Sequence, residues 1–114
     1  MSIQGGAQTV SGEDLVELRL AHVTYYSPHD ECCFFAWLHK MRFVEEFHGR
    51  GDAIILSVNR ASMTRADLED LIGFFYRYGI SMPQLRVFDC PEFSGWFRNR
   101  EKYWYYRVFR SKAR

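Results

Sequence analysis

The chain has 114 residues, close to the commonest size of a single domain, and this length predicts one domain. Its hydrophobic (47%) and charged (25%) fractions exclude a disordered chain, because disorder needs low hydrophobicity and high net charge. No segment approaches the roughly 20 apolar residues of a membrane span, and the N-terminus lacks the basic start and apolar stretch of a signal peptide. We therefore expect a cytoplasmic protein that does not contact a membrane.

The net charge of +1 is unevenly distributed along the chain. Residues 1–85 contain 7 basic and 11 acidic residues, a net charge of −4, whereas residues 86–114 contain 8 basic and 3 acidic residues, a net charge of +5. This asymmetry indicates either two partners or a basic segment that folds back on its own acidic body. We expect residues 1–13 to be a flexible lead-in, residues 14–110 to form a single α+β domain, and residues 111–114 to be a basic tail.

The first strand is predicted between Val16 and Tyr26, because apolar and polar residues alternate there with a period of two. The Ser-Pro pair that follows ends this strand. Asp30 can cap the next helix, which we expect to end near Lys40. Apolar residues recur on one face of this helix at the spacing i, i+3, i+4, i+7: Phe34, Trp37, Leu38 and Met41.

A β-hairpin is predicted next. Two short β-prone runs, residues 43–47 and 53–59, flank a loop of about five residues that contains two glycines. Residues 53–58 include few polar side chains, so we expect this strand to lie in the centre of the sheet.

The clearest helix begins at Thr64, whose hydroxyl can cap the backbone N–H of Asp67. Gly79 lies where a residue in the left-handed conformation would end this helix. One apolar stripe runs along it: Leu68, Leu71, Ile72, Phe75 and Tyr78.

The C-terminal segment is less regular. Pro83 suits the first turn of a short helical piece, and Cys90-Pro91 interrupts the chain again. A helical stripe follows, which Asn99-Arg100 can interrupt: Phe93, Phe97, Trp104 and Val108. Residues 103–109 are compatible with a strand as well, although helix is favoured. The element order predicts an α+β fold, with helices on one face of a small, mostly antiparallel sheet and an aromatic-rich, mostly helical C-terminal segment.

The cysteines and histidines suggest no metal site. His29, Cys32, Cys33 and His39 lie within eleven residues, but zinc needs four converging ligands, and a helix would turn His39 away from the others. The cysteine count is odd and gives no disulfide framework, so we expect Cys90 and the adjacent pair to be buried in a reducing compartment. Phenylalanines next to the pair favour packing over nucleophilic chemistry.

No motif typical of an enzyme is present in the sequence. Neither G-x-x-x-x-G-K nor G-x-G-x-x-G occurs, and no carboxylate pair stands beside a Lys or His at a nuclease-like spacing. Glu45 and Glu46 are neighbours that a regular strand would place on opposite faces. The sequence therefore predicts a protein that is not an enzyme, with no catalytic residue and no cofactor.

The segment REKYWYYRVFR, residues 100–110, interleaves aromatic and basic residues. Exposed rings beside cations can bind single-stranded nucleic acid, so an adaptor for such nucleic acid is one hypothesis. The same residues can close the core of a small domain. In that case we expect Tyr103, Trp104 and Val108 inside, and at least one of Tyr105 and Tyr106 exposed.

Two stretches, LEDLIGFFYRYGISMPQLRVF and WFRNREKYWYYRVF, carry a family resemblance. They resemble immunity proteins of bacterial contact-dependent growth inhibition systems, which have a helix ending in an F-Y-R-Y-like run, an M-x-Q-L turn, a W-F element and a Y-W-x-x-x-V-F ending. The matching residues are Phe75, Tyr76, Arg77, Tyr78, Met82, Gln84, Leu85, Trp96, Phe97, Tyr103, Trp104, Val108 and Phe109. A G-x-G-D loop before an apolar strand also matches, and the resemblance spans about residues 18–110.

The resemblance implies a protein that binds a cognate toxin domain, often a nuclease, and blocks its active site. Because nuclease toxins are usually basic, acidic residues of the body are the expected toxin-binding candidates. These candidates are Asp30, Glu31, Glu45, Glu46, Asp52, Asp67, Glu69 and Asp70. A sheet edge that pairs with a toxin hairpin is a second possible contact. Such a protein is expected to be a monomer or a dimer when free.

Overall fold

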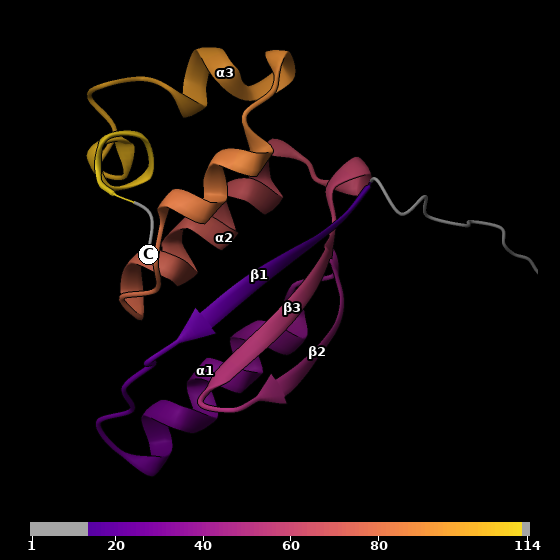
Figure 1. The fold of residues 1–114 in the computed structure, drawn as a ribbon, viewed down its shortest axis with the longest axis vertical. Coiled ribbons are helices and arrows are strands. Elements are labelled where there is room, and N and C mark those ends of the chain that lie inside the picture. Colours follow the sequence, from indigo (N-terminus) through magenta and orange to yellow (C-terminus); the bar gives the residue numbers. More distant parts are fainter. Residues whose placement is uncertain (1–13, 113–114) are drawn as a thin grey trace, which may run out of the picture.

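The computed structural model describes residues 14–112, which form a three-stranded antiparallel sheet packed against helices (Figure 1). The predicted α+β fold class is confirmed, whereas the predicted lead-in, residues 1–13, lies outside the described residues. The strands are β1 (Leu15–Ala21), β2 (Val44–Arg50) and β3 (Ala53–Asn59), and the helices are α1 (Pro28–Lys40), α2 (Arg65–Arg77) and α3 (Pro91–Phe97). Two 3-10 helices, Arg60–Ser62 and Pro83–Phe88, and a π-helical turn, Tyr106–Arg110, complete the structure.

The sheet has the order β1-β3-β2, so the predicted central position of the apolar strand is confirmed. The antiparallel register pairs Leu18 with Leu56 and Val16 with Val58, which places these four apolar residues on one face of the sheet. Strand β1 ends at Ala21, earlier than the predicted end at Tyr26. His22 adopts a left-handed backbone (φ 59°), and this conformation cannot continue a strand.

The hairpin loop is shorter than the predicted five residues. Arg50 pairs directly with Ala53, so the turn contains only Gly51 and Asp52. Gly51 has φ +63°, as the first central residue of a type II′ turn requires, and glycine adopts this conformation at no steric cost.

Helix α1 is capped by Ser27 rather than by Asp30. The Ser27 hydroxyl accepts the Asp30 N–H at 3.1 Å, and the Asp30 carboxylate accepts the Tyr26 N–H at 2.9 Å. Two N–H groups near the start of the helix are thereby satisfied. The helix ends at Lys40 as predicted, and three of its four predicted apolar positions are buried: Phe34, Leu38 and Met41.

Helix α2 follows its prediction closely. Thr64 and Asp67 form a reciprocal capping box, in which each side chain accepts the other residue's backbone N–H. At the other end, Gly79 has φ +66° and the Ile80 N–H bonds to the Phe75 carbonyl, which is the Schellman arrangement. Five residues of the helix are buried: Leu68, Leu71, Ile72, Phe74 and Phe75.

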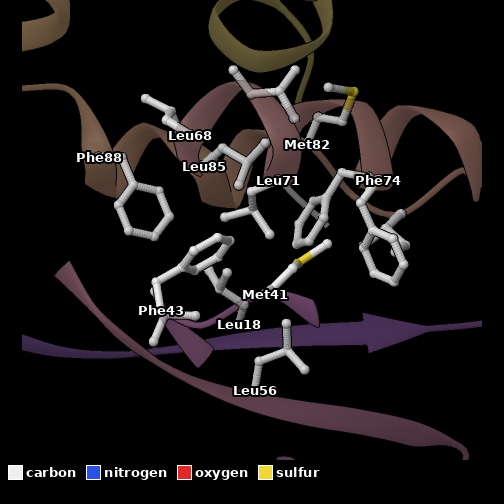
Figure 2. Close-up of a cluster of buried hydrophobic side chains, with 14 of the residues drawn as sticks. Leu18, Met41, Phe43, Leu56, Leu68, Leu71, Phe74, Met82, Leu85 and Phe88 are labelled. Atoms are coloured by element: carbon white, nitrogen blue, oxygen red, sulfur yellow. The ribbon is translucent and has the colours of Figure 1, made fainter. Parts of the chain in front are cut away.

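One hydrophobic cluster fills the space between the sheet and the helices (Figure 2). Leu18 and Leu56 extend from the strands toward Leu71 and Phe74 of α2, and Leu85 lies above them. The cluster also contains Phe34 and Leu38 of α1, so both long helices cover the same face of the sheet. Among residues 14–112, no helix is both long enough and apolar enough to cross a membrane.

The C-terminal segment gathers around α2, away from the β2–β3 turn (Figure 1). Helix α3 ends at Phe97, close to the predicted interruption, and residues 106–110 are helical rather than a strand. Trp104 is buried and its indole Nε1–H donates to the Phe97 carbonyl at 2.9 Å, while Val108 is fully buried. The predicted core positions of Trp104 and Val108 are therefore confirmed.

The tyrosines of this segment are more exposed than the sequence predicted for Tyr103. Tyr103 is 53% exposed, so its predicted burial is wrong, because its ring packs edge-on against Tyr76 at 4.9 Å on the outer side of α2. Tyr106 is 68% exposed, which confirms that at least one of Tyr105 and Tyr106 faces solvent.

Much of the basic charge near the C-terminus folds back onto the domain. Arg98 forms an ion pair with Asp89. Four cations lie over aromatic rings, with 4.6 to 5.9 Å between cation and ring centroid: Arg65 over Trp96, Arg98 over Phe109, Lys102 over Trp104 and Arg107 over Tyr76. Cation–π contacts of this kind hold long basic side chains against the surface.

Candidate protein-binding surface

Helices α1 and α2 run antiparallel, and two aspartates join them at opposite ends of their contact. The Tyr78 hydroxyl, near the end of α2, donates to Asp30 Oδ1 in the first turn of α1 at 3.4 Å. Farther along, the Trp37 indole Nε1–H of α1 donates to Asp70 Oδ1 of α2 at 3.0 Å. The outward side of this helix pair is therefore bordered by carboxylates.

Between these two contacts lies a cavity of about 410 Å³, which we call the aromatic groove. Gly73 forms part of its floor, and a Cβ added there would come within 3.8 Å of the Tyr103 hydroxyl. A Cβ at this distance would make ordinary van der Waals contact, so Tyr103 lies directly over Gly73 of α2. The groove is lined by residues of α1, of α2 and its C-terminal cap, and of the C-terminal segment: Cys33, Trp37, Gly73, Tyr76, Arg77, Tyr78 and Tyr103.

Two tyrosines of the groove, Tyr78 and Tyr103, have a raised pKa. Burial, and then the negative charge and hydrogen bond of Asp30, raise the pKa of Tyr78 above its ordinary value. Burial, and then the charge of Glu69, likewise raise the pKa of Tyr103. Both phenols therefore remain hydrogen-bond donors at neutral pH.

Three of the eight predicted toxin-binding carboxylates border the aromatic groove. Asp30 and Asp70 bond to its lining residues Tyr78 and Trp37, and Glu69 lies close enough to Tyr103 to raise its pKa. The apolar stripe in the sequence of α2 could not predict this arrangement, because the arrangement depends on how α1 packs against α2.

The other five candidate carboxylates lie elsewhere. Asp67 belongs to the capping box of α2, and Glu31 is exposed in the first turn of α1. Asp52, in the β2–β3 turn, lies 3.7 Å from Arg19 and 3.8 Å from His22. The remaining two, Glu45 and Glu46, are exposed on β2.

The candidates also differ in what their carboxylates already bind. Asp30, Asp67 and Asp70 accept hydrogen bonds that shape the domain. By contrast, four glutamates have neither an ion pair nor a side-chain hydrogen bond within residues 14–112: Glu31, Glu45, Glu46 and Glu69. Of these four, Glu69 is the one beside the groove.

The expected burial of the cysteines is wrong. Cys32 and Cys33 are exposed and Cys90 is half-buried. Helix α1 turns Phe34 and Leu38 toward the core, so the two residues before Phe34 lie on its outer side. Within the described part of the chain, no group of three or more His, Cys, Asp or Glu side chains could hold a metal ion.

The two edge strands of the sheet, β1 and β2, differ in the hydrogen bonding of their outer backbone groups. On the outer edge of β1, the Gln84 side chain accepts the Arg19 N–H and donates to the Arg19 carbonyl, both at 2.8 Å. This amide forms the two hydrogen bonds that a neighbouring strand would form with Arg19, so it covers the edge at that residue. On β2, residues 45–50 have no backbone hydrogen bond within residues 14–112 apart from those to β3. The register is shifted between Val44 and Glu46, so Glu45 is the extra residue of a β-bulge.

None of the seven residues that line the groove was anticipated as a binding residue. One feature of the sequence could have indicated the groove. Tyr76 is aromatic but lies outside the apolar stripe of α2, and a large ring on the polar side of a helix indicates a contact with another side chain or a partner. No family model, no curated protein and no solved structure matches this chain.

Proposed function

We propose that this chain is an immunity protein that binds the C-terminal toxin domain of a contact-dependent growth inhibition effector and occludes its active site. The family assignment is supported by the sequence resemblance over about residues 18–110. The observation that carries the binding role is the aromatic groove, in which indole and phenol rings are bordered by carboxylates. The protein acts in the cytoplasm, where the toxin would otherwise reach its substrate.

The composition of the groove suits a protein partner. Trp, Tyr and Arg are the residues that most often carry the binding energy of protein interfaces, and Trp37, Tyr76 and Arg77 lie together here. Their side chains are held by packing: Trp37 lies against Phe74 at 5.1 Å, and Tyr76 against Tyr103. Rings that are fixed before binding lose little entropy when a partner arrives.

The charge of the groove suits a basic partner. Three carboxylates border the groove, Asp30, Glu69 and Asp70, against two cations, Arg77 in its lining and Arg107 over the Tyr76 ring. A nuclease toxin carries cations where it binds the phosphates of its substrate. Carboxylates placed opposite those cations accelerate association and exclude the substrate. Occlusion of this kind requires no catalytic residue in the immunity protein.

The alternative function, an adaptor for single-stranded nucleic acid, needs a row of exposed rings in residues 100–110. In this segment only Tyr103 and Tyr106 are more than half exposed, and Tyr103 belongs to the aromatic groove. Trp104 is buried and Phe109 is half-buried beneath Arg98. The segment therefore offers few stacking platforms, which favours protein binding.

The proposal is tested with the toxin domain encoded beside this gene. The purified chain should form a stable complex with that domain, inhibit its activity and protect a bacterial host that expresses it. We expect Tyr103→Ala and Glu69→Arg each to weaken the complex by about tenfold or more, as loss of a central interface residue does. Both side chains are exposed, so neither variant should unfold the domain.

The matched control is Glu46→Arg, the same charge reversal on the free edge of β2. If Glu46→Arg weakens the complex and Glu69→Arg does not, the toxin binds at the sheet edge and the groove assignment is wrong. If the wild-type chain neither binds the toxin domain nor protects the host, the proposed function itself is wrong.

A further inference from the structure

A second cavity, of about 530 Å³, lies where the turn after α2 faces the end of the C-terminal segment. We call it the basic pocket. Its volume falls in the range of small-ligand sites, roughly 300 to 1,000 Å³. Its residues come from two stretches that are distant in sequence: Gly79, Ile80, Ser81, Met82 and Pro83 on one side, and Tyr106, Arg107, Ser111 and Lys112 on the other.

The charged residues of the basic pocket are all cations. Arg107 and Lys112 line it, and no aspartate or glutamate does. The Arg107 guanidinium carbon lies 4.6 Å from the centroid of the Tyr76 ring, and this cation–π contact holds the side chain beside the pocket. Two positive charges in a pocket lined by no carboxylate are suited to a doubly charged anion such as a phosphate monoester.

Uncharged donors complete the polar part of the pocket. The Ser81 hydroxyl has no hydrogen-bond partner within residues 14–112, so its O–H is free to donate to an anion. Gly79 lines the same wall, and a Cβ built there would meet no atom within 4 Å, so the backbone faces open space. A ligand can therefore approach the main chain closely at this point.

An aromatic surface stands beside these donors. The Tyr106 ring borders the pocket and is 68% exposed, although its backbone is held by the hydrogen bond from the Ser111 N–H to the Tyr106 carbonyl. An exposed ring on a fixed backbone is a platform on which a nucleobase can stack, and base–aromatic stacking contributes about 1 to 3 kcal/mol per base.

We infer that the basic pocket binds a nucleotide through its phosphate monoester, with Arg107, Lys112 and Ser81 on the phosphate and Tyr106 stacked on the base. This inference does not depend on the immunity function, because the pocket and the aromatic groove share no lining residue. According to this inference, the interleaved basic and aromatic residues of the C-terminal segment bind a ligand of one or two nucleotides and not a long single strand.

The test is an NMR titration of the full chain with adenosine 5′-monophosphate and uridine 5′-monophosphate at low salt. Saturable shifts should be concentrated at the amides of residues 79–82 and 106–112. The corresponding nucleosides and inorganic phosphate should each bind at least about tenfold more weakly, because each retains only one of the two contacts. The binding of a 5′-phosphorylated dinucleotide is also compared with that of its 5′-hydroxyl form. Tighter binding of the phosphorylated form would show that the ligand can be the 5′ end of a nucleic acid as well as a free nucleotide.

Two variants and a control decide the assignment. Lys112→Gln and Tyr106→Ala should each raise the Kd by about three- to tenfold, whereas Arg100→Gln, an exposed arginine of the same segment outside the pocket, should leave the Kd unchanged. No saturable shifts with either nucleotide, equal binding of inorganic phosphate, or equal effects of all three substitutions would each overturn the inference.

Discussion

Residues 15–80 and residues 83–112 build the same hydrophobic core in different ways. The first region uses a sheet and two helices of 13 residues, whose apolar stripes repeat at the regular period of their elements. The second uses a 3-10 helix, a short helix and a π-helical turn, in which buried residues recur at irregular intervals. Apolar side chains can therefore be buried without regular secondary structure. An irregular segment, however, needs other groups to form hydrogen bonds with its backbone.

The second region needs side chains where the first region uses its backbone. In the sheet and the long helices, most N–H and C=O groups pair through the ladder and the caps. In the C-terminal segment, the Arg86 guanidinium donates to the carbonyls of Val108 and Ser111 at 2.7 and 2.8 Å, and the Trp104 indole donates to that of Phe97. Arginine and tryptophan thus bond carbonyls at the ends of short elements.

The largest predicted effect tests whether the two regions form one cooperative unit. Leu71→Ala in α2 and Phe97→Ala at the end of α3 each remove a fully buried side chain, so each should lower the free energy of unfolding by about 3 to 5 kcal/mol. Urea unfolding should show a single transition for both variants. A second transition confined to Phe97→Ala would mean that the C-terminal segment unfolds separately.

A smaller effect is expected where side chains replace backbone bonds. Arg86→Met keeps the aliphatic stem and removes the donors to the Val108 and Ser111 carbonyls, so stability should fall by about 1 to 2 kcal/mol. Hydrogen exchange should become faster in residues 106–111 and remain unchanged in β3. Exchange that accelerates equally everywhere would show that Arg86 does not act locally on the C-terminal turn.

The smallest effect concerns Tyr78, at the boundary of the two regions. Burial and Asp30 raise its pKa in the folded state above the ordinary value of about 10, so the unfolded chain loses this proton first. The contribution of Tyr78 is fully present below about pH 10 and is lost as the pH rises through the folded pKa. Tyr78→Phe should therefore flatten the loss of stability between about pH 9 and 11 in urea titrations, whereas Tyr26→Phe, at a ring that is 88% exposed, should not.

The sequence predicted the regular elements of the fold better than its irregular segments. Periodicity identified β1, α1 and α2, because a regular element repeats its pattern over several residues. A β-prone run identified β3, and a glycine after the apolar stripe identified the left-handed Gly79. The two-residue turn at Gly51 and the end of β1 at His22 were missed, because single backbone conformations leave no periodic trace. For residues 103–109 the sequence left helix and strand open, since a π-helical turn matches neither period.

The candidate site was predictable only in part. The family resemblance implied that acidic residues bind the partner, and three of the eight candidates, Asp30, Glu69 and Asp70, border the aromatic groove. Composition could not show that Asp67 is used in a helix cap, nor that Tyr103 would lie over Gly73. The position of Tyr103 depends on a contact between residues 30 positions apart in the chain, which no local pattern encodes. The cap, by contrast, joins Thr64 and Asp67, which are three residues apart.

Gln84 also limits how copies of this protein can assemble. Its side chain occupies the Arg19 rung on the outer edge of β1, so another strand could add there only by displacing it. Two molecules that met edge to edge through β2 would form one continuous six-stranded sheet with a β1 strand at each end. Gln84 would cover the Arg19 position at both ends of that sheet, which favours a pair over continued growth into a fibril.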